Sequence, residues 1–197
     1  MTARTSHILL VFSAFLAGLV IFLGVILFMT EGHVPGSGPS AIGGPFKLID
    51  QDGKPVTDQD FKGRPLLVFF GYTHCPDICP TTLFELSEVL RALGKDADRI
   101  NALFITVDPE RDTAAVMKDY LSSFDPRLRG ATGDQKAIDA VEKDYRVYAK
   151  KVPIKDGDYS MDHTALVYLM DKQGRFVAPF KLDRKPEQAA ADLRRYL

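Results

Sequence analysis

Two cysteines separated by three residues are the side chains of this sequence best suited to chemistry. Cys75 and Cys79 lie in the stretch LLVFFGYTHCPDICP, residues 66–80, and they are the only cysteines of the 197-residue chain. A disulfide between them would close a very short loop and would constrain the unfolded chain little. A reversible dithiol, or a pair of ligands for one metal ion, therefore explains this spacing better than a structural bridge does.

A metal bound by these cysteines would need at least one further ligand. Two thiolates form a soft site that favours Cu(I) or Zn(II) over magnesium or calcium, and a structural zinc site would require a fourth protein ligand. Among the histidines, His163 is the favoured third ligand because it precedes an apolar segment, 164–170, expected to lie beside the strand before the cysteines. His74 adjoins Cys75, but neighbouring residues of an extended segment point to opposite sides. As a cation, His74 would instead lower the pKa of Cys75.

Two aspartates flank the candidate ligands. Asp77 lies between the cysteines, and Asp162 directly precedes His163. Either carboxylate would orient a metal ligand through an outer-sphere hydrogen bond. The alternatives are local roles, in which Asp77 faces solvent or accepts loop N–H groups and Asp162 caps a turn.

The residues around the cysteines predict the elements that position them. The apolar run 66–70 is typical of a fully buried strand. Pro80 suits the first turn of a helix, whose apolar residues recur on one face at Leu83, Leu86, Val89, Leu90 and Leu93. The thiols are therefore expected at or just before a helix N-terminus. Free backbone N–H groups and the helix dipole there are expected to lower thiol pKa values.

The remaining elements predict an α/β fold. Hydrophobic periodicity and turn residues predict a hairpin around Asp52-Gly53 and strands at 100–107, 164–170 and 176–180. They also predict helices ending near 121 and 145, a terminal helix from Pro186, and a short strand at 146–149 followed by an exposed polar loop, 150–162. This order predicts a thioredoxin-like fold with a mixed central sheet flanked by helices. Its chemistry is expected at the carboxyl ends of the strands.

The N-terminal region predicts attachment to a membrane. After a short tail, 1–7, residues 8–29 carry no charge and are long enough for a transmembrane anchor. Residues 30–44 are expected to form a flexible tether, because 36–44 read GSGPSAIGG, and the domain is expected over 45–197. Arg4 before the apolar segment and Glu31 after it favour a domain outside the cytoplasm. The net charge of −1 and the scattered basic residues argue against nucleic acid as a partner.

Three motifs in order resemble the SCO/SenC family. They are GYTHCPDICP from Gly71 to Pro80, TVDPERDT from Thr106 to Thr113, and YSMDHT from Tyr159 to Thr164. The resemblance covers roughly residues 45–197. It implies a thioredoxin-like domain that binds one copper ion, as Cu(I) or Cu(II), through Cys75, Cys79 and His163. It also implies a metallochaperone, not an enzyme, that assists assembly of the dinuclear copper centre of cytochrome c oxidase subunit II.

The same resemblance implies further partners and a location. The further partners are another periplasmic copper chaperone or a thiol reductant. The location is the inner membrane of a bacterium, which the chain crosses once, with the domain in the periplasm. A bacterial location is favoured over the mitochondrial inner membrane. A second function stays open, a thiol-disulfide oxidoreductase that keeps the target's copper-ligating cysteines reduced, with Cys75 attacking and Cys79 resolving. His163 separates the two functions, because copper binding needs it and simple exchange does not.

Overall fold

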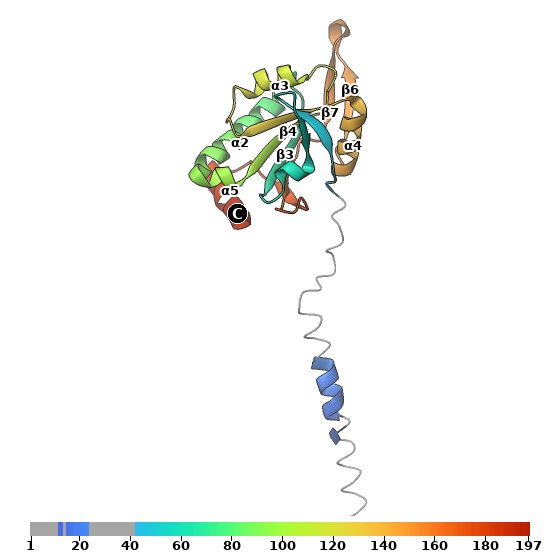
Figure 1. The fold of residues 1–197 in the computed structure, drawn as a ribbon, viewed down its shortest axis with the longest axis vertical. Helices are drawn as coiled ribbons and strands as arrows, with labels where there is room; N and C mark the ends of the chain where they lie inside the picture. Colours follow the sequence, from blue (N-terminus) through green and yellow to red (C-terminus); the bar gives the residue numbers. More distant parts are fainter. Residues whose placement is uncertain (1–11, 14, 24–41) are drawn as a thin grey trace, which may run out of the picture. The chain divides into compact units, whose positions relative to one another are not determined.

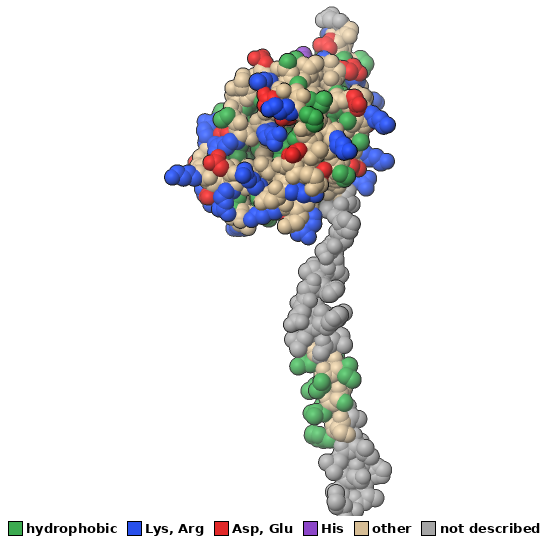
Figure 2. Space-filling view, viewed as in Figure 1, with side chains coloured by type: hydrophobic (Ala, Val, Ile, Leu, Met, Phe, Trp, Pro, Cys, Tyr) green, Lys and Arg blue, Asp and Glu red, His purple; other side chains and the backbone are tan. Residues whose placement is uncertain are grey.

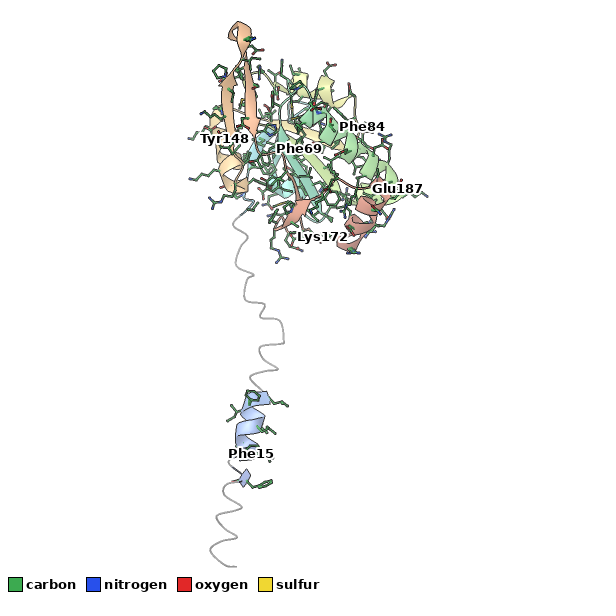
Figure 3. The ribbon with its side chains drawn as sticks, turned by 180° about the vertical axis from the view of Figure 1, so that it is seen from behind. Phe15, Phe69, Phe84, Tyr148, Lys172 and Glu187 are labelled. Atoms are coloured by element: carbon green, nitrogen blue, oxygen red, sulfur yellow. The ribbon has the colours of Figure 1, made fainter. Side chains whose placement is uncertain are left out.

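The computed structural model describes residues 12–13, 15–23 and 42–197, and the chain divides into two compact units, 1–39 and 40–197. In the first unit, residues 15–23 are helical and expose apolar side chains such as Phe15, which Figure 3 labels. Within the ranges just given, no helix is both long and apolar enough to cross a membrane. The other residues of the predicted anchor, 8–29, and the predicted tether up to residue 41 lie outside the described residues.

A seven-stranded mixed sheet forms the centre of the second unit (Figure 1). Its strands lie in the order β2-β1-β5-β4-β3-β8-β9. Strands β3, β4 and β5 run parallel, and the other pairings are antiparallel. The bounds are β1 (Lys47–Asp50), β2 (Pro55–Thr57), β3 (Leu66–Gly71), β4 (Asn101–Thr106), β5 (Leu128–Thr132), β8 (Val167–Met170) and β9 (Phe176–Phe180).

Helices cover both faces of this sheet. Phe70 packs on Tyr145 at the end of α4, whereas its neighbour Gly71 lies against Cys79 of α2. Because successive residues of a strand face opposite sides, α2 and α4 lie on opposite faces. The helices are α2 (Ile78–Leu93), α3 (Ala114–Leu121), α4 (Gln135–Tyr145) and α5 (Pro186–Leu193), with short 3-10 helices at η1 (Asp58–Phe61), η2 (Gly94–Arg99), η3 (Lys155–Gly157) and η4 (Arg194–Tyr196). The predicted α/β fold with a mixed sheet is confirmed.

Strand β3 is the most deeply buried element. It pairs with β4 on one edge and β8 on the other, and all six of its residues are buried. The five apolar residues of α2 predicted to share a face are buried as well. The local apolar pattern therefore identified the strand and helix that flank the cysteines.

The prediction of an exposed polar loop over residues 150–162 is wrong. Strand β6 (Ala149–Pro153) pairs antiparallel with β7 (Tyr159–His163) in a sheet of its own, with Ala149 opposite His163. This β6–β7 hairpin projects beyond the main sheet in Figures 1 and 3. Strand β6 is largely exposed and β7 is mostly half-buried, so the pattern that marks a buried strand is missing. His163 consequently ends β7, rather than beginning the strand β8.

Charged side chains of both signs are mixed on the face of this unit that Figure 2 shows. Figure 2 shows lysine and arginine interspersed with aspartate and glutamate over the visible face. This pattern agrees with the near-zero net charge of the sequence.

Candidate metal centre

The two cysteines lie where β3 leads into α2, as predicted. Cys75 is in the connecting loop, Cys79 is in the first turn of α2, and both thiols are free. The backbone N–H of Cys79 donates to the Sγ atom of Cys75 over 3.4 Å. The helix start thus holds the two sulfur-bearing residues in contact.

Cys79 is enclosed by the end of β3. A Cβ atom added at Gly71 would lie 2.7 Å from the Cys79 Sγ atom and 2.8 Å from a ring carbon of Phe104. The absence of a side chain at Gly71 therefore makes the space that the sulfur occupies. In the sequence Gly71 was notable only as part of a motif, although a glycine at a strand end signals such a close approach.

Burial determines the acidity of Cys79. Desolvation raises the pKa of its thiol well above the ordinary value, and the neighbouring Cys75 adds to this effect. The prediction of a lowered pKa at the helix N-terminus is wrong for Cys79, because the cost of burying a thiolate exceeds the lowering effect of the backbone hydrogen bond with Tyr72. A metal ion binding here would have to displace the proton.

His163 meets Cys79 in this site. Its Nε2 atom lies 3.6 Å from the Cys79 Sγ atom, and its Nδ1 atom lies 3.1 Å from the carbonyl oxygen of Thr164. Since a carbonyl only accepts, Nδ1 carries the hydrogen and Nε2 presents a lone pair towards the sulfur. Burial lowers the pKa of His163, which favours the neutral ring. This is the protonation state of an imidazole that binds a metal.

The other candidate residues, His74, Asp77 and Asp162, are exposed at the edge of this site. His74 is exposed, and its Nδ1 atom lies 3.1 Å from the Thr73 hydroxyl. Asp77 is the N-cap residue of α2 but makes no side-chain capping hydrogen bond within the described part of the chain. Asp162 is exposed, and its charge opposes the lowering of the His163 pKa. An outer-sphere role for either aspartate stays a prediction.

A pocket of about 510 Å³ opens beside these residues. Its walls come from the cysteine loop, the start of α2 and the β6–β7 hairpin, and they include Tyr72, Cys75, Asp77, Ile78, Val152, Met161, Asp162 and His163. No group of three or more histidine, cysteine or acidic side chains in residues 42–197 or the described N-terminal helix is arranged to hold a metal ion. Cys79 is in contact with His163 and with Cys75, but the three side chains are not arranged around one point. A ligand set of all three therefore stays a prediction. Two sulfurs and one imidazole nitrogen form a donor set that suits Cu(I).

A buried aspartate, Asp112, fixes the cysteine loop. The Asp112 carboxylate is fully buried and accepts hydrogen bonds from the Thr73 N–H at 2.9 Å and the Thr73 hydroxyl at 2.6 Å. It also accepts one from the Thr106 hydroxyl at 2.7 Å. Asp112 thus holds the chain two residues before Cys75.

A second buried aspartate contacts the hairpin. Asp108 is fully buried and accepts a hydrogen bond from the Tyr159 hydroxyl at 2.8 Å. It also pairs with Arg111, which donates to the Tyr159 carbonyl oxygen at 3.0 Å. Burial and the bond to Asp108 raise the pKa of Tyr159 to about 12, so its hydroxyl keeps the donated proton. The motif TVDPERDT was noted in the sequence, but its pattern alone gave these residues no role.

Comparison with known proteins identifies the family. The SCO1/SenC family description matches residues 34–197. The SCO2-like protein of Rickettsia felis is 41% identical over 149 residues, which cover 75% of this chain and 73% of the relative.

Two solved structures share the fold. Bradyrhizobium japonicum ScoI with copper bound has 72% sequence identity and a TM-score of 0.78, and the match covers 79% of this chain and 99% of that one. Yeast Sco1 with copper bound has 38% identity and a TM-score of 0.73, covering 80% and 88%. Copper is thus bound by related structures, as the resemblance predicted, and the thioredoxin-like fold class is theirs too. The chain belongs to the SCO1/SenC family.

Proposed function

We propose that this chain is a membrane-anchored copper metallochaperone that assists assembly of the dinuclear copper centre of cytochrome c oxidase subunit II. Cys75, Cys79 and His163 bind one copper ion as cargo. The observation that carries this proposal is the lone pair of a neutral His163 facing the Cys79 sulfur at 3.6 Å, beside Cys75. The copper bound by relatives of the same family supports the choice of metal.

The geometry suits both binding and release. Cys79 is buried, whereas Cys75 is partly exposed and lines the pocket with His163. A three-coordinate Cu(I) would remain open on the pocket side, where thiols of a target protein take the ion by ligand exchange. Oxidation of the two thiols to a disulfide removes both sulfur ligands, so copper loading requires the reduced pair.

The anchor and location form part of the proposal. Residues 8–29 carry no charge, and the helical residues 15–23 expose large apolar side chains such as Phe15 and Phe22. We place the anchor in the inner membrane of a bacterium, crossed once, with the domain in the periplasm. A flexible tether then raises the effective concentration of the domain near a membrane-bound oxidase.

The free thiols favour a second candidate function, thiol-disulfide exchange. Cys75 is the accessible thiol and would attack, and the adjacent Cys79 would resolve the mixed disulfide. The target would be the copper-ligating cysteines of subunit II. Partners of this reaction, a thiol reductant or another periplasmic copper chaperone, would restore the dithiol or supply the ion.

An anaerobic Cu(I) titration against a competing chelator tests the proposal. The reduced full-length chain in detergent should bind one copper ion. His163→Ala should weaken binding by at least about tenfold, because loss of a ligand costs no less than loss of an outer-sphere partner. His74→Ala is the matched control, since His74 lies beside Cys75 but outside the cluster, and it should retain the original affinity.

The contrary outcome is equally definite. Equal copper affinity in the wild type and His163→Ala would reject the proposed ligand set. If that result came with rapid reduction of an oxidised subunit II domain by the dithiol, the oxidoreductase would be the better account.

A further inference from the structure

The strand that carries His163 is held to the body of the domain by side chains. Strands β6 and β7 pair with each other in a two-stranded sheet, separate from the seven-stranded one. In β7 only Met161 is buried, and it keeps 9% of its surface exposed. The position of His163 therefore depends on polar contacts as well as on core packing.

Arg111 makes several of these contacts with one residue of β7. Its guanidinium carbon lies 3.8 Å from the centre of the Tyr159 ring. Its Nη1 atom donates to the Tyr159 carbonyl oxygen at 3.0 Å and to the Asp158 carboxylate at 3.1 Å. Arg111 thus fixes both the ring and the backbone of Tyr159, four residues before His163.

The residues around Arg111 add to this contact. Asp108 pairs with the Arg111 Nε atom and accepts the Tyr159 hydroxyl at 2.8 Å. Lys151 of β6 lies 4.7 Å from the Tyr159 ring centre, on which its ammonium packs, and pairs with Glu110 at 2.5 Å. Both strands of the hairpin are therefore in contact with one short segment, residues 108–112.

The same segment is fixed to the cysteine loop. The Asp112 carboxylate binds the backbone and hydroxyl of Thr73, and the Asp112 N–H donates to the Asp108 carbonyl oxygen at 2.9 Å. The Thr132 hydroxyl in β5 donates to the Asp112 carbonyl oxygen at 2.7 Å. Segment 108–112 is thus a common support for the loop before Cys75 and for strand β7.

A second path leads from Arg111 to the imidazole. The guanidinium carbon lies 5.8 Å from the ring centre of Tyr72, and that ring meets His163 edge-on at 5.8 Å between centres. Arg111 therefore supports His163 through the backbone of β7 and through an aromatic side chain of the cysteine loop.

We propose that Arg111 is a positioning residue of the copper site, which fixes β7 relative to the cysteine loop and so sets the distance between His163 Nε2 and the sulfurs. This inference rests on the proposed function for its consequence in copper binding. Asp108 and Tyr159 are the groups through which Arg111 acts. The planar guanidinium suits this role, because it binds a carboxylate, a carbonyl and a ring at once, which a lysine does not.

The first test needs no copper. In the metal-free, reduced, full-length chain in detergent, Arg111→Met should increase amide hydrogen exchange of residues 159–163 by about tenfold or more, as the hairpin opens locally. Arg111→Lys and Tyr159→Phe are milder variants and should give smaller increases of the same kind. The matched control is Arg175→Met, which removes an arginine paired with Asp171 at 2.7 Å in the turn between β8 and β9. This control should leave exchange at 159–163 unchanged.

The second test couples Arg111 to His163. Arg111→Met should weaken copper binding by about tenfold when His163 is present, and by less than about twofold in a His163→Ala background. Equal weakening in both backgrounds would show a general structural effect and overturn the proposal, as would unchanged exchange at 159–163. Failure of the ligand set is distinguishable, because it would appear as wild-type copper affinity in His163→Ala alone.

Discussion

Strands β3 and β7 bring the candidate ligands to one site by different physical means. Strand β3 is paired on both edges, and all six of its residues are buried. Strand β7 is paired with β6, and one of its five residues is buried. The first strand delivers the cysteines from the hydrophobic core, and the second delivers His163 from a projecting hairpin.

The difference shows that one site can combine a rigid half, the cysteines that follow β3, with an adjustable half, His163 on β7. Apolar packing positions Cys79, so its place is determined by the folding of the whole domain. Hydrogen bonds and a cation–π contact to Tyr159 position β7, and such contacts break without unfolding the core. A copper carrier needs both properties, because it must hold an ion tightly and still release it by ligand exchange.

The largest expected effect tests the core half of this comparison. Phe69 of β3 is fully buried and stacks on Phe104 at 5.9 Å between ring centres, whereas Phe84 on α2 is 55% exposed (Figure 3). Phe69→Ala should lower the free energy of unfolding by about 3–5 kcal/mol through the cavity that it creates. Phe84→Ala should change it by less than about 0.5 kcal/mol. Urea unfolding measures both, and similar losses would contradict the burial argument.

The next effect concerns segment 108–112, which supports both the cysteine loop and strand β7. The Asp112 carboxylate accepts three hydrogen bonds from Thr73 and Thr106, and an asparagine amide would turn one acceptor oxygen into a donor. Asp112→Asn should therefore cost roughly 2–3 kcal/mol of stability. It should also increase the reactivity of Cys75 with a thiol reagent. Asp119→Asn, at an exposed position of α3, is the control, and equal losses for the two variants would remove Asp112 from this role.

The same contrast explains what the sequence could predict. Strand β3 and helix α2 were predicted because their apolar pattern is local and strong. The β6–β7 hairpin was missed because its strands are polar and its support comes from Arg111, which is 48 residues before its partner Tyr159. The raised pKa of Cys79 was missed for a similar reason, since the burial of its sulfur depends on the packing of Gly71 and Phe104. The place of His163 beside Cys79 could be predicted because the apolar segment that follows it was expected to lie beside β3, and β8 does pair with β3.

A smaller effect is expected where the core touches the sulfur. Gly71→Ala would bring its Cβ atom to 2.7 Å from the Cys79 Sγ atom, which is too close for either group to remain in place. We expect a loss of about 1–3 kcal/mol in stability together with weaker copper binding. Gly133→Ala is the matched control, because its nearest contact would be 3.2 Å from a Leu48 methyl group. If Gly71→Ala bound copper like the wild type, the close approach would have no functional importance.

The smallest effect is a pH dependence at the base of the hairpin. The backbone carbonyl of Glu142 in α4 accepts the Val147 N–H just before β6, whereas the side-chain Oε1 atom of Glu142 is buried with no hydrogen-bond partner among the described residues. Burial, with a smaller contribution from Asp139, raises the pKa of Glu142 to about 7. The protonated acid is therefore favoured in the folded state. Its stabilisation is complete below the unfolded pKa near 4.5 and is lost as the pH rises through about 7.

Replacing this group with a neutral one tests the assignment. Glu142→Gln cannot ionise, so it should exceed the wild type in stability by roughly 1–3 kcal/mol at pH 8 and by much less at pH 4. Glu187→Gln, at an exposed position of α5 labelled in Figure 3, is the control and should not reproduce the gain at pH 8. Urea unfolding at both pH values measures the difference. A gain confined to pH 8 would show that the base of the hairpin, unlike β3, is weakened by a buried charge, whereas a gain independent of pH would assign the effect to packing.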